Sequence, residues 1–262
     1  MHPWNIAHRG GALLMPENTL PAFADALARG CDGVELDVQL TRDGIAVVHH
    51  DDRLMADVAR RDGVWLDVPG PRTGDLTWGE LQRFDVGTAR PASPYALAHP
   101  RLAPTGAQEP KLDAVVDLAR MAGRRFLLLV ELKVAEDADP LALADGAYDV
   151  IAASDFLKNV IFVGFDWRAL ARIRARDPNA ACWFTTDRLK AGAQPAIEMI
   201  LAAGGQGWFP HFQDATPENV LYARERGLKV GAWTVNRRDD MERLRDLDAI
   251  CTDRPDILAG LS

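Results

Sequence analysis

Residues 33–52 read GVELDVQLTRDGIAVVHHDD and combine two strand-like runs with a tight turn. Val34–Val38 alternates apolar and acidic residues, Ala46–His49 is mostly apolar, and Asp43-Gly44 lies between them. Asp-Gly between two such runs is a strong β-hairpin signal. The first strand carries two acids and the second ends in two histidines and two aspartates. The hairpin therefore gathers many ionisable groups at one end.

The turn allows two registers of this hairpin. If the Asp-Gly pair occupies the central turn positions, Asp37 faces His50, and a turn centred one residue earlier places Glu35 opposite His50. Side chains alternate between the faces of a strand. Both registers therefore predict that Glu35, Asp37 and His50 share one face and that His49 points away from it.

Two carboxylates on one strand face repel each other unless solvent or a cation separates them. Carboxylate oxygens suit hard ions such as Mg²⁺ or Ca²⁺. The pattern of Glu35 and Asp37 is therefore consistent with a metal site, and an exposed acidic face of an ordinary ribbon is the alternative interpretation.

The rest of the chain alternates short apolar runs with helical patterns. Leaving out the second hairpin strand, eight runs have strand length: Trp4–Ala7, Val34–Val38, Phe126–Leu132, Val160–Gly164, Ala181–Phe184, Gly207–Phe209, Lys229–Trp233 and Ala249–Thr252. Helical spacing occurs after an Asn18 N-cap as far as Gly30, and over Lys111–Met121, Leu141–Leu157, Trp167–Arg176, Pro195–Ala203, Pro217–Arg226 and Arg238–Arg245. This alternation predicts a TIM (β/α)₈ barrel. An open doubly wound sheet is the alternative, weakened because no G-x-G-x-x-G follows the first strand.

The segment Arg53–Pro110 interrupts this rhythm with many Pro and Gly residues. It holds one short helix signal, the capping box Thr77–Glu80. Long irregular segments in a compact domain are usually functional loops, lids or disordered pieces. We predict a single catalytic barrel domain over residues 1–262, with an insertion at about residues 53–110 after the hairpin of the second strand.

Composition narrows the class of protein. The chain has 262 residues, of which 48% are hydrophobic and 26% are charged, as is usual for a globular protein. Its net charge of −8 disfavours binding of nucleic acid by a basic surface. Cys31, Cys182 and Cys251 form no Cys-x-x-Cys pair, which fits a reducing compartment. Because the N-terminus lacks signal-peptide features and no apolar run could span a bilayer, we expect a cytoplasmic protein without stable membrane insertion.

Ionisable residues also follow two other predicted strands. His8-Arg9 comes after the first strand, and Glu131 and Lys133 end the strand that begins at Phe126. Active-site residues of such barrels lie at the C-terminal ends of strands. His8 alone could be a satisfied core histidine, and Glu131 with Lys133 could be an exposed pair. Their coincidence at one rim with the acids of the hairpin favours a site.

Taken together, these motifs resemble one enzyme family. The matches are His8-Arg9-Gly10, Pro16-Glu17-Asn18-Thr19, Glu35-x-Asp37, Val47-Val48-x-His50-Asp51, Glu131-Leu132-Lys133, Trp233-Thr234-Val235-Asn236 and Thr252-Asp253-x-Pro255. The chain resembles the glycerophosphodiester phosphodiesterases, of the phospholipase C-like phosphodiesterase superfamily. The match is dense over the first fifty-odd residues and loose at about 58–108 and 137–214.

The resemblance implies a TIM barrel with a small insertion and one divalent cation, Mg²⁺ or Ca²⁺. It assigns roles by residue: metal ligands Glu35, Asp37 and Glu131; general acid and base His8 and His50, in either order; phosphate-binding cations Arg9 and Lys133; substrate pocket Trp233 and Glu17. A favourable charge at a helix N-terminus is the alternative for Glu17.

The function implied is hydrolysis of a small-molecule glycerophosphodiester to glycerol 3-phosphate and an alcohol such as choline or ethanolamine. The nucleophile is either the glycerol 2-hydroxyl, which gives a cyclic phosphate, or water. Two alternatives stay open: a lysophospholipase D-like phosphodiesterase and a non-catalytic barrel that binds a phosphoryl ligand. Trp65, Trp78, Phe84 and Tyr95 could form the apolar lip that a lipid substrate needs, or could pack the insertion against the barrel.

Overall fold

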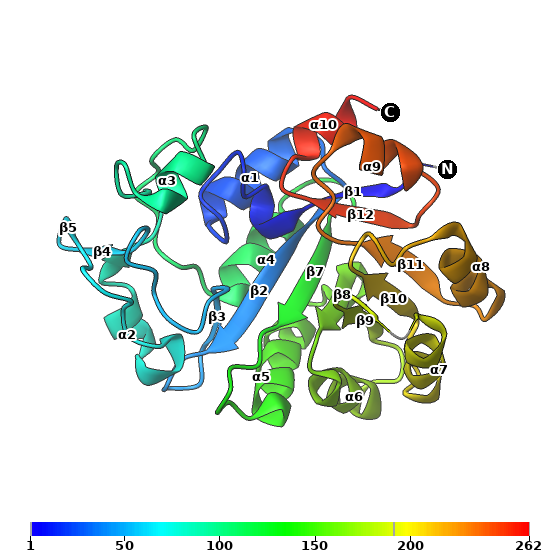
Figure 1. Ribbon diagram of the computed structural model, residues 1–262. Coiled ribbons are helices and arrows are strands. Elements are labelled where there is room, and N and C mark those ends of the chain that lie inside the picture. Colours follow the sequence, from blue (N-terminus) through cyan, green and yellow to red (C-terminus); the bar gives the residue numbers. More distant parts are fainter. Residues whose placement is uncertain (1, 191, 262) are drawn as a thin grey trace.

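A sheet that closes on itself forms the centre of the computed structural model, which describes residues 2–190 and 192–261 (Figure 1). Within these residues its parallel strands run in the order β1, β12, β11, β10, β9, β8, β7, β2, and β2 pairs again with β1. They are β1 (Trp4–Ala7), β2 (Gly33–Leu40), β7 (Leu127–Leu132), β8 (Val160–Gly164), β9 (Ala181–Thr186), β10 (Gly207–Pro210), β11 (Lys229–Ala232) and β12 (Ala249–Thr252). The predicted TIM barrel is confirmed.

Helices between the strands cover the outside of the barrel (Figure 1). They are α1 (Leu20–Ala28), α4 (Leu112–Arg120), α5 (Pro140–Ala153), α6 (Trp167–Arg176), α7 (Gln194–Ala202), α8 (Pro217–Glu225), α9 (Arg238–Arg243) and α10 (Pro255–Ala259), with 3₁₀ turns η1 (His8–Gly10) and η3 (Leu157–Asn159). The predicted Asn18 cap of α1 is wrong by one residue. Thr19 caps the helix by accepting a hydrogen bond from Ala22 N at 3.3 Å. None of the described helices is long and apolar enough to cross a membrane.

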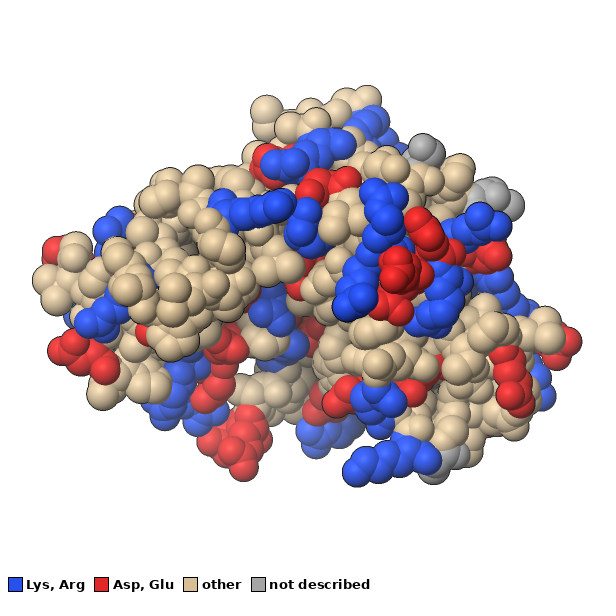
Figure 2. Space-filling model, turned by 45° about the horizontal axis from the view of Figure 1, so that its top comes forward, with Lys and Arg blue, Asp and Glu red and all other residues tan. Residues whose placement is uncertain are grey.

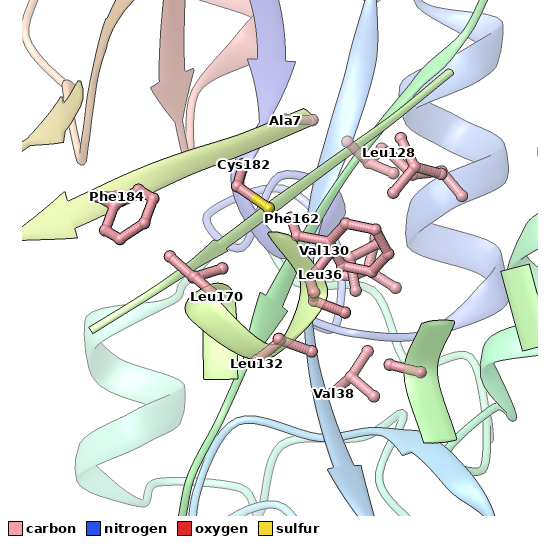
Figure 3. Packing of buried hydrophobic residues seen from close by; sticks show 14 of the residues in the cluster. Ala7, Leu36, Val38, Leu128, Val130, Leu132, Phe162, Leu170, Cys182 and Phe184 are labelled. Carbon is pink, nitrogen blue, oxygen red and sulfur yellow. The ribbon is translucent and has the colours of Figure 1, made fainter. Parts of the chain in front are cut away.

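Alternation along the strands sorts side chains between two apolar layers. On β2 and β7, Leu36, Val38, Leu128 and Val130 point outward and pack under the helices (Figure 3). Leu127 and Leu129 on β7 belong to the separate cluster inside the barrel. By the same period of two, Glu35 and Asp37 on β2 and Glu131 on β7 point inward at the C-terminal ends of their strands.

The hairpin strand β3 (Ala46–Val48) pairs antiparallel with β2, but in neither predicted register. Val38 faces Val48 and Leu40 faces Ala46. The turn has three residues, Arg42 to Gly44, because Thr41 N donates to Ile45 O and Gly44 takes a left-handed φ of 77°. Three-residue hairpins of this kind need glycine at that position. The parity argument for His50 and His49 therefore fails, and their placement has another cause.

The segment after β3 forms a small unit beside the barrel, on the left of Figure 1. It contains a three-stranded sheet of β4 (Arg60–Arg61), β5 (Val64–Trp65) and β6 (Phe84–Asp85), the turn η2 (Thr73–Asp75), and helices α2 (Trp78–Leu81) and α3 (Pro94–Ala98). The predicted capping box is present, since Thr77 and Glu80 bond reciprocally at the start of α2. The unit has its own apolar cluster around Leu54, Leu81 and Phe84.

Charge is distributed without a single dominant sign on the face shown in Figure 2. Basic and acidic side chains are interspersed over the barrel, and much of the upper part of the inserted segment on the left shows neither. On this face, the surface therefore offers no broad basic area of the kind that general binding of nucleic acid requires.

Candidate active site

Three buried carboxylates meet inside the C-terminal end of the barrel. Asp37 lies directly opposite Glu131 in the β2–β7 register, and Glu35 precedes Asp37 on the same face. One ligand atom from each lies within 4.8 Å of the others, and the three residues are 1%, 1% and 7% exposed. Glu35 Oε1 and Asp37 Oδ1 are buried without a hydrogen-bond partner among the described residues. This donor set fits a hard divalent cation, which would satisfy both oxygens.

Two carboxyls of the cluster have pKa values shifted in opposite directions. Burial and the charge of Asp37 raise the pKa of Glu35 to about 8. Burial also acts to raise the pKa of Asp37, but Arg9 and Lys133 outweigh it and hold that pKa well below its usual range. Because metal ligands must be deprotonated, a bound cation would displace a proton from Glu35.

Arg9 contributes both its backbone and its side chain to the carboxylates. Its backbone N–H donates to Glu35 Oε2 at 3.1 Å, and its Nε lies 3.2 Å from Asp37 Oδ2. The tight turn that permits this depends on Gly10, which has a φ of 86°, and a Cβ there would lie 2.7 Å from the Cβ of Ala22. The His-Arg-Gly sequence therefore has a steric reason for its glycine.

Lys133 supplies a second cation from the end of β7. Its Nζ lies 2.5 Å from Glu131 Oε1 and 3.4 Å from Asp37 Oδ1. Burial lowers the pKa of Lys133, but the neighbouring carboxylates outweigh it and raise the pKa above its ordinary value. Arg9 and Lys133 thus place two stable positive charges beside the three acids.

His8 lies between the carboxylate cluster and Asp253. Its Nδ1 is 2.6 Å from Asp253 Oδ1, and its Nε2 is 3.8 Å from Glu35 Oε2. Asn236 Nδ2 donates to the other oxygen of Asp253 at 2.7 Å. Burial lowers the pKa of His8, but the hydrogen bond that His8 donates to Asp253 and the charge of Glu35 outweigh it and raise the pKa. Asn236 and Asp253 belong to two of the sequence motifs, but no sequence pattern indicated that they orient His8.

His50 lies beyond the end of β3, on a loop held by the barrel. The Gln39 side chain donates to the carbonyl oxygens of His49, His50 and Asp51 at 3.0, 3.1 and 2.8 Å. His50 lies close enough to Asp37 to help lower the pKa of that carboxyl. His49 instead pairs with Glu109, with its Nδ1 3.2 Å from Oε1. The loop, not hairpin parity, separates the two histidines.

Asn18 and Glu17 support the site from the loop before α1. Asn18 takes a left-handed φ of 56°, and its Nδ2 donates to Asp37 Oδ2 at 2.8 Å. Glu17 accepts from Arg9 Nη1 at 2.9 Å and from the Tyr95 hydroxyl at 3.4 Å. Glu17 thus joins Arg9 to the inserted segment. No sequence pattern indicated that Tyr95 contacts Glu17, because α3 is five residues long and lies in an irregular region.

Trp233 forms an aromatic corner near the cations. Its ring packs edge-on against the rings of Phe165 and His211, with ring centres 5.2 Å and 5.6 Å apart. Its Nε1 donates a hydrogen bond to Phe209 O. Lys133 Nζ lies 5.5 Å from the centre of the Phe165 ring. Phe165 is 43% exposed, so the corner offers apolar surface beside the charged centre.

Comparison with known proteins gives one consistent family. A sequence model of the glycerophosphoryl diester phosphodiesterase family matches residues 8–257. A glycerophosphodiester phosphodiesterase from Caldanaerobacter subterraneus is 30% identical, over 98% of this chain and 96% of that protein. A Silicibacter pomeroyi crystal structure that carries the family's name has a TM-score of 0.90 and 31% identity, over 98% and 92% of the two chains.

A second solved structure includes a reaction product. It is an Oleispira antarctica phosphodiesterase in complex with the product sn-glycerol-3-phosphate, with a TM-score of 0.79 and 26% identity. The alignment covers 100% of this chain and 98% of that one. The span matched by the family model contains the carboxylate cluster, both histidines and both cations of the site.

Proposed function

The chain belongs to the glycerophosphoryl diester phosphodiesterase family, and we propose that it hydrolyses glycerophosphodiesters to glycerol 3-phosphate and an alcohol at the carboxylate centre. The observation that carries the proposal is the buried cluster of Glu35, Asp37 and Glu131, with ligand atoms within 4.8 Å of one another. Arg9 and Lys133 bring two positive charges to these three carboxylates. Glu35 Oε1 and Asp37 Oδ1 have no hydrogen-bond partner among the described residues, which is costly for buried charges unless a further cation pairs with them.

We propose that these three residues hold one divalent cation, Mg²⁺ or Ca²⁺. When bound, such an ion neutralises phosphoryl oxygens and stabilises the charge that develops in the transition state. Arg9 and Lys133 add to this stabilisation by binding the remaining phosphoryl oxygens. Asn18 keeps Asp37 in place by bonding to its carboxylate and its backbone N–H.

His8 and His50 supply the proton transfers. We assign the general acid to His8, because Asp253 favours its protonated form and leaves Nε2 directed toward the centre. His8 would protonate the leaving alkoxide. His50 would act as general base and remove the proton of the attacking hydroxyl as its oxygen bonds to phosphorus, before the leaving alkoxide takes the proton of His8. Histidine suits both roles, because its ordinary pKa lies near neutrality and the side chain can therefore donate or accept a proton.

We place the alcohol portion of the substrate beside the aromatic corner. Trp233 and Phe165 offer apolar ring surface, which attracts quaternary ammonium groups by cation–π interaction. Glu17 would stand at the rim, where it orients Arg9. This ring surface supports choline or ethanolamine as the alcohol group, because both carry an ammonium group.

Residues 53–110 belong to the same catalytic unit in this proposal, because Tyr95 reaches Glu17 at the rim of the site and Glu109 reaches His49, the residue before His50. The three free and buried cysteines support a reducing, cytoplasmic location.

The test is hydrolysis of glycerophosphocholine and glycerophosphoethanolamine, with glycerol 3-phosphate as the measured product. We expect release by the native protein and a roughly 10²- to 10⁴-fold loss in His8→Ala, since general acid catalysis contributes about that much. Phosphorus NMR during turnover separates the two routes, because attack by the glycerol 2-hydroxyl produces a cyclic phosphate first. Lysophosphatidylcholine serves as a second substrate. Preferential cleavage of it would replace the proposed substrate class with the lipid one.

A further inference from the structure

Glu109 is a buried carboxylate that the proposed reaction does not use. It lies at the end of the inserted segment, three residues before α4, and its side chain is 1% exposed. Its partner is His49, whose Nδ1 lies 3.2 Å from Oε1. Glu109 Oε1 and Oε2 and His49 Nε2 are buried without a hydrogen-bond partner in the described part of the chain, so the contact of His49 with Glu109 is a close approach and not a well-oriented hydrogen bond.

The pair lies between apolar and polar surroundings. The small cavity that it lines has apolar walls at Met55, Val58, Ala59 and Val86, and polar walls at Glu17, Asn18, His50 and Asp51. Replacement of a buried ion pair by an apolar pair of similar volume is often neutral or stabilising. The pair of His49 and Glu109 therefore calls for an explanation other than stability.

The position of the pair suggests that explanation. His49 directly precedes His50, and its backbone N–H donates to Asp37 O at 2.9 Å. On the other side, Val48 N donates to Pro110 O at 2.9 Å, next to Glu109. The loop that begins at His49 is thus held between the metal-binding strand and the end of the inserted segment.

His50 itself has few contacts that could fix it. Its side chain is 29% exposed, and the hydrogen bond of its Nδ1 goes to the adjacent Asp51, which lies on the same loop. A partner on the same loop moves with it, so the place of His50 relative to Asp37 depends on what holds the backbone of the loop.

We propose that His49 and Glu109 form a positioning pair, which locks the end of the inserted segment to the loop of His50 and so sets the position of the general base. The inference rests on the proposed function for its catalytic part. The positional part rests on geometry alone: one buried side-chain pair and one backbone hydrogen bond join the two segments at adjacent residues.

The experiment compares His49→Leu, Glu109→Leu and the double variant. Each single change leaves one polar partner buried alone, so we expect both to lower thermal stability. The double variant removes both and is expected to recover stability to near the native value. If the pair positions His50, the double variant still loses at least about ten-fold in kcat with KM little changed, because small displacements of a catalytic group are costly.

Two readouts separate positioning from packing. Hydrogen exchange of the amides of residues 49–52 should quicken at least about ten-fold in the double variant, while the barrel strands keep native protection. Calorimetry should show native affinity for added Mg²⁺ or Ca²⁺. Glu80→Gln serves as the matched control in the same segment, because Glu80 caps α2 away from His50, and it should leave kcat unchanged.

Native kcat in the stable double variant would overturn the proposal, as would native exchange of the loop or a loss of metal binding. The two proposals can fail separately. If the native protein cleaves no glycerophosphodiester but the loop amides are released in the double variant, the proposed function fails and the positioning pair stands.

Discussion

The carboxylate centre and the loop of His50 lie in one site, but different kinds of structure hold them. Asp37 and Glu131 are neighbours in a parallel ladder whose register is fixed by closure of the barrel. His50 stands beyond the last residue of β3 and depends on side-chain contacts from Gln39 and the neighbouring pair. Metal ligation should therefore tolerate changes outside the barrel, whereas the position of His50 should not.

The largest expected effect lies in the barrel half of this comparison. Asp37→Asn should abolish binding of the divalent cation and lower kcat/KM by roughly 10³-fold or more, because a metal stabilises the transition state by several kcal/mol. Calorimetry and turnover of glycerophosphocholine check both. Cation binding of native affinity in this variant would contradict the three-ligand site.

The loop half is broken most directly at His50, the general base that we propose. His50→Ala should lower kcat by roughly 10²- to 10⁴-fold, the usual contribution of a general base. Cation affinity should stay native, since the three ligands lie on the barrel strands. Loss of cation binding together with activity would show that the two halves are not independent.

Asp253 tests how His8 is held. Because Asp253 raises the pKa of His8 against the lowering effect of burial, Asp253→Asn should lower that pKa. The limb of the pH–rate profile that reports the protonated acid should then move to lower pH, with about a ten-fold loss at neutral pH. A profile that loses amplitude without moving would mean that His8 is not the group that titrates.

The raised pKa of Glu35 predicts that the folding stability of the protein depends on pH when a chelator keeps divalent cations away. The folded pKa is about 8, above the value of about 4.3 in an unfolded chain. The folded state therefore binds a proton that the unfolded state has lost, so this stabilisation is present below the unfolded pKa and disappears as pH rises through about 8. Asp37, whose pKa is lowered, titrates below this window.

Thermal unfolding measures this effect. Between about pH 5 and pH 9, the Tm of the chelated native protein should fall several °C further than that of Glu35→Gln, which cannot ionise. Added cation should remove the difference, because binding requires the carboxylate. Parallel Tm curves for the two chelated proteins would contradict the raised pKa.

The smallest expected effect concerns the link from the inserted segment to Arg9. Tyr95→Phe removes the hydroxyl that donates to Glu17 and should lower kcat/KM by about two- to ten-fold, the worth of one hydrogen bond. His99 stacks on the Tyr95 ring with the ring centres 4.1 Å apart, and a Phe ring should keep this stacking. A loss of 10²-fold or more would place the hydroxyl in direct contact with the reacting groups.

This contrast also explains what the sequence could predict. The barrel and the meeting of Glu35, Asp37 and Glu131 followed from strand periodicity and from the rule that strand ends share a rim. Both predicted hairpin registers were wrong, because the turn has three residues and Gly44 absorbs the extra one in a left-handed conformation.

The parts of the site that were missed depend on contacts that no local pattern encodes. Tyr95 reaches Glu17 across 78 residues of chain, and Asp253 reaches His8 across 245. The strands β4, β5 and β6 are two residues long, too short to leave an alternating signal. The contact of Asp253 with His8 depends on closure of the barrel, which places β12 beside β1, and the other features depend on packing of the inserted segment.

The central claim is that a divalent cation held by the three barrel carboxylates is required for hydrolysis. The most direct test strips the native protein with a chelator and measures release of glycerol 3-phosphate from glycerophosphocholine before and after Mg²⁺ or Ca²⁺ is restored. Our account predicts that turnover disappears in chelator, returns with one of these ions, and does not return in Glu131→Gln. Undiminished turnover by the fully stripped protein would contradict it.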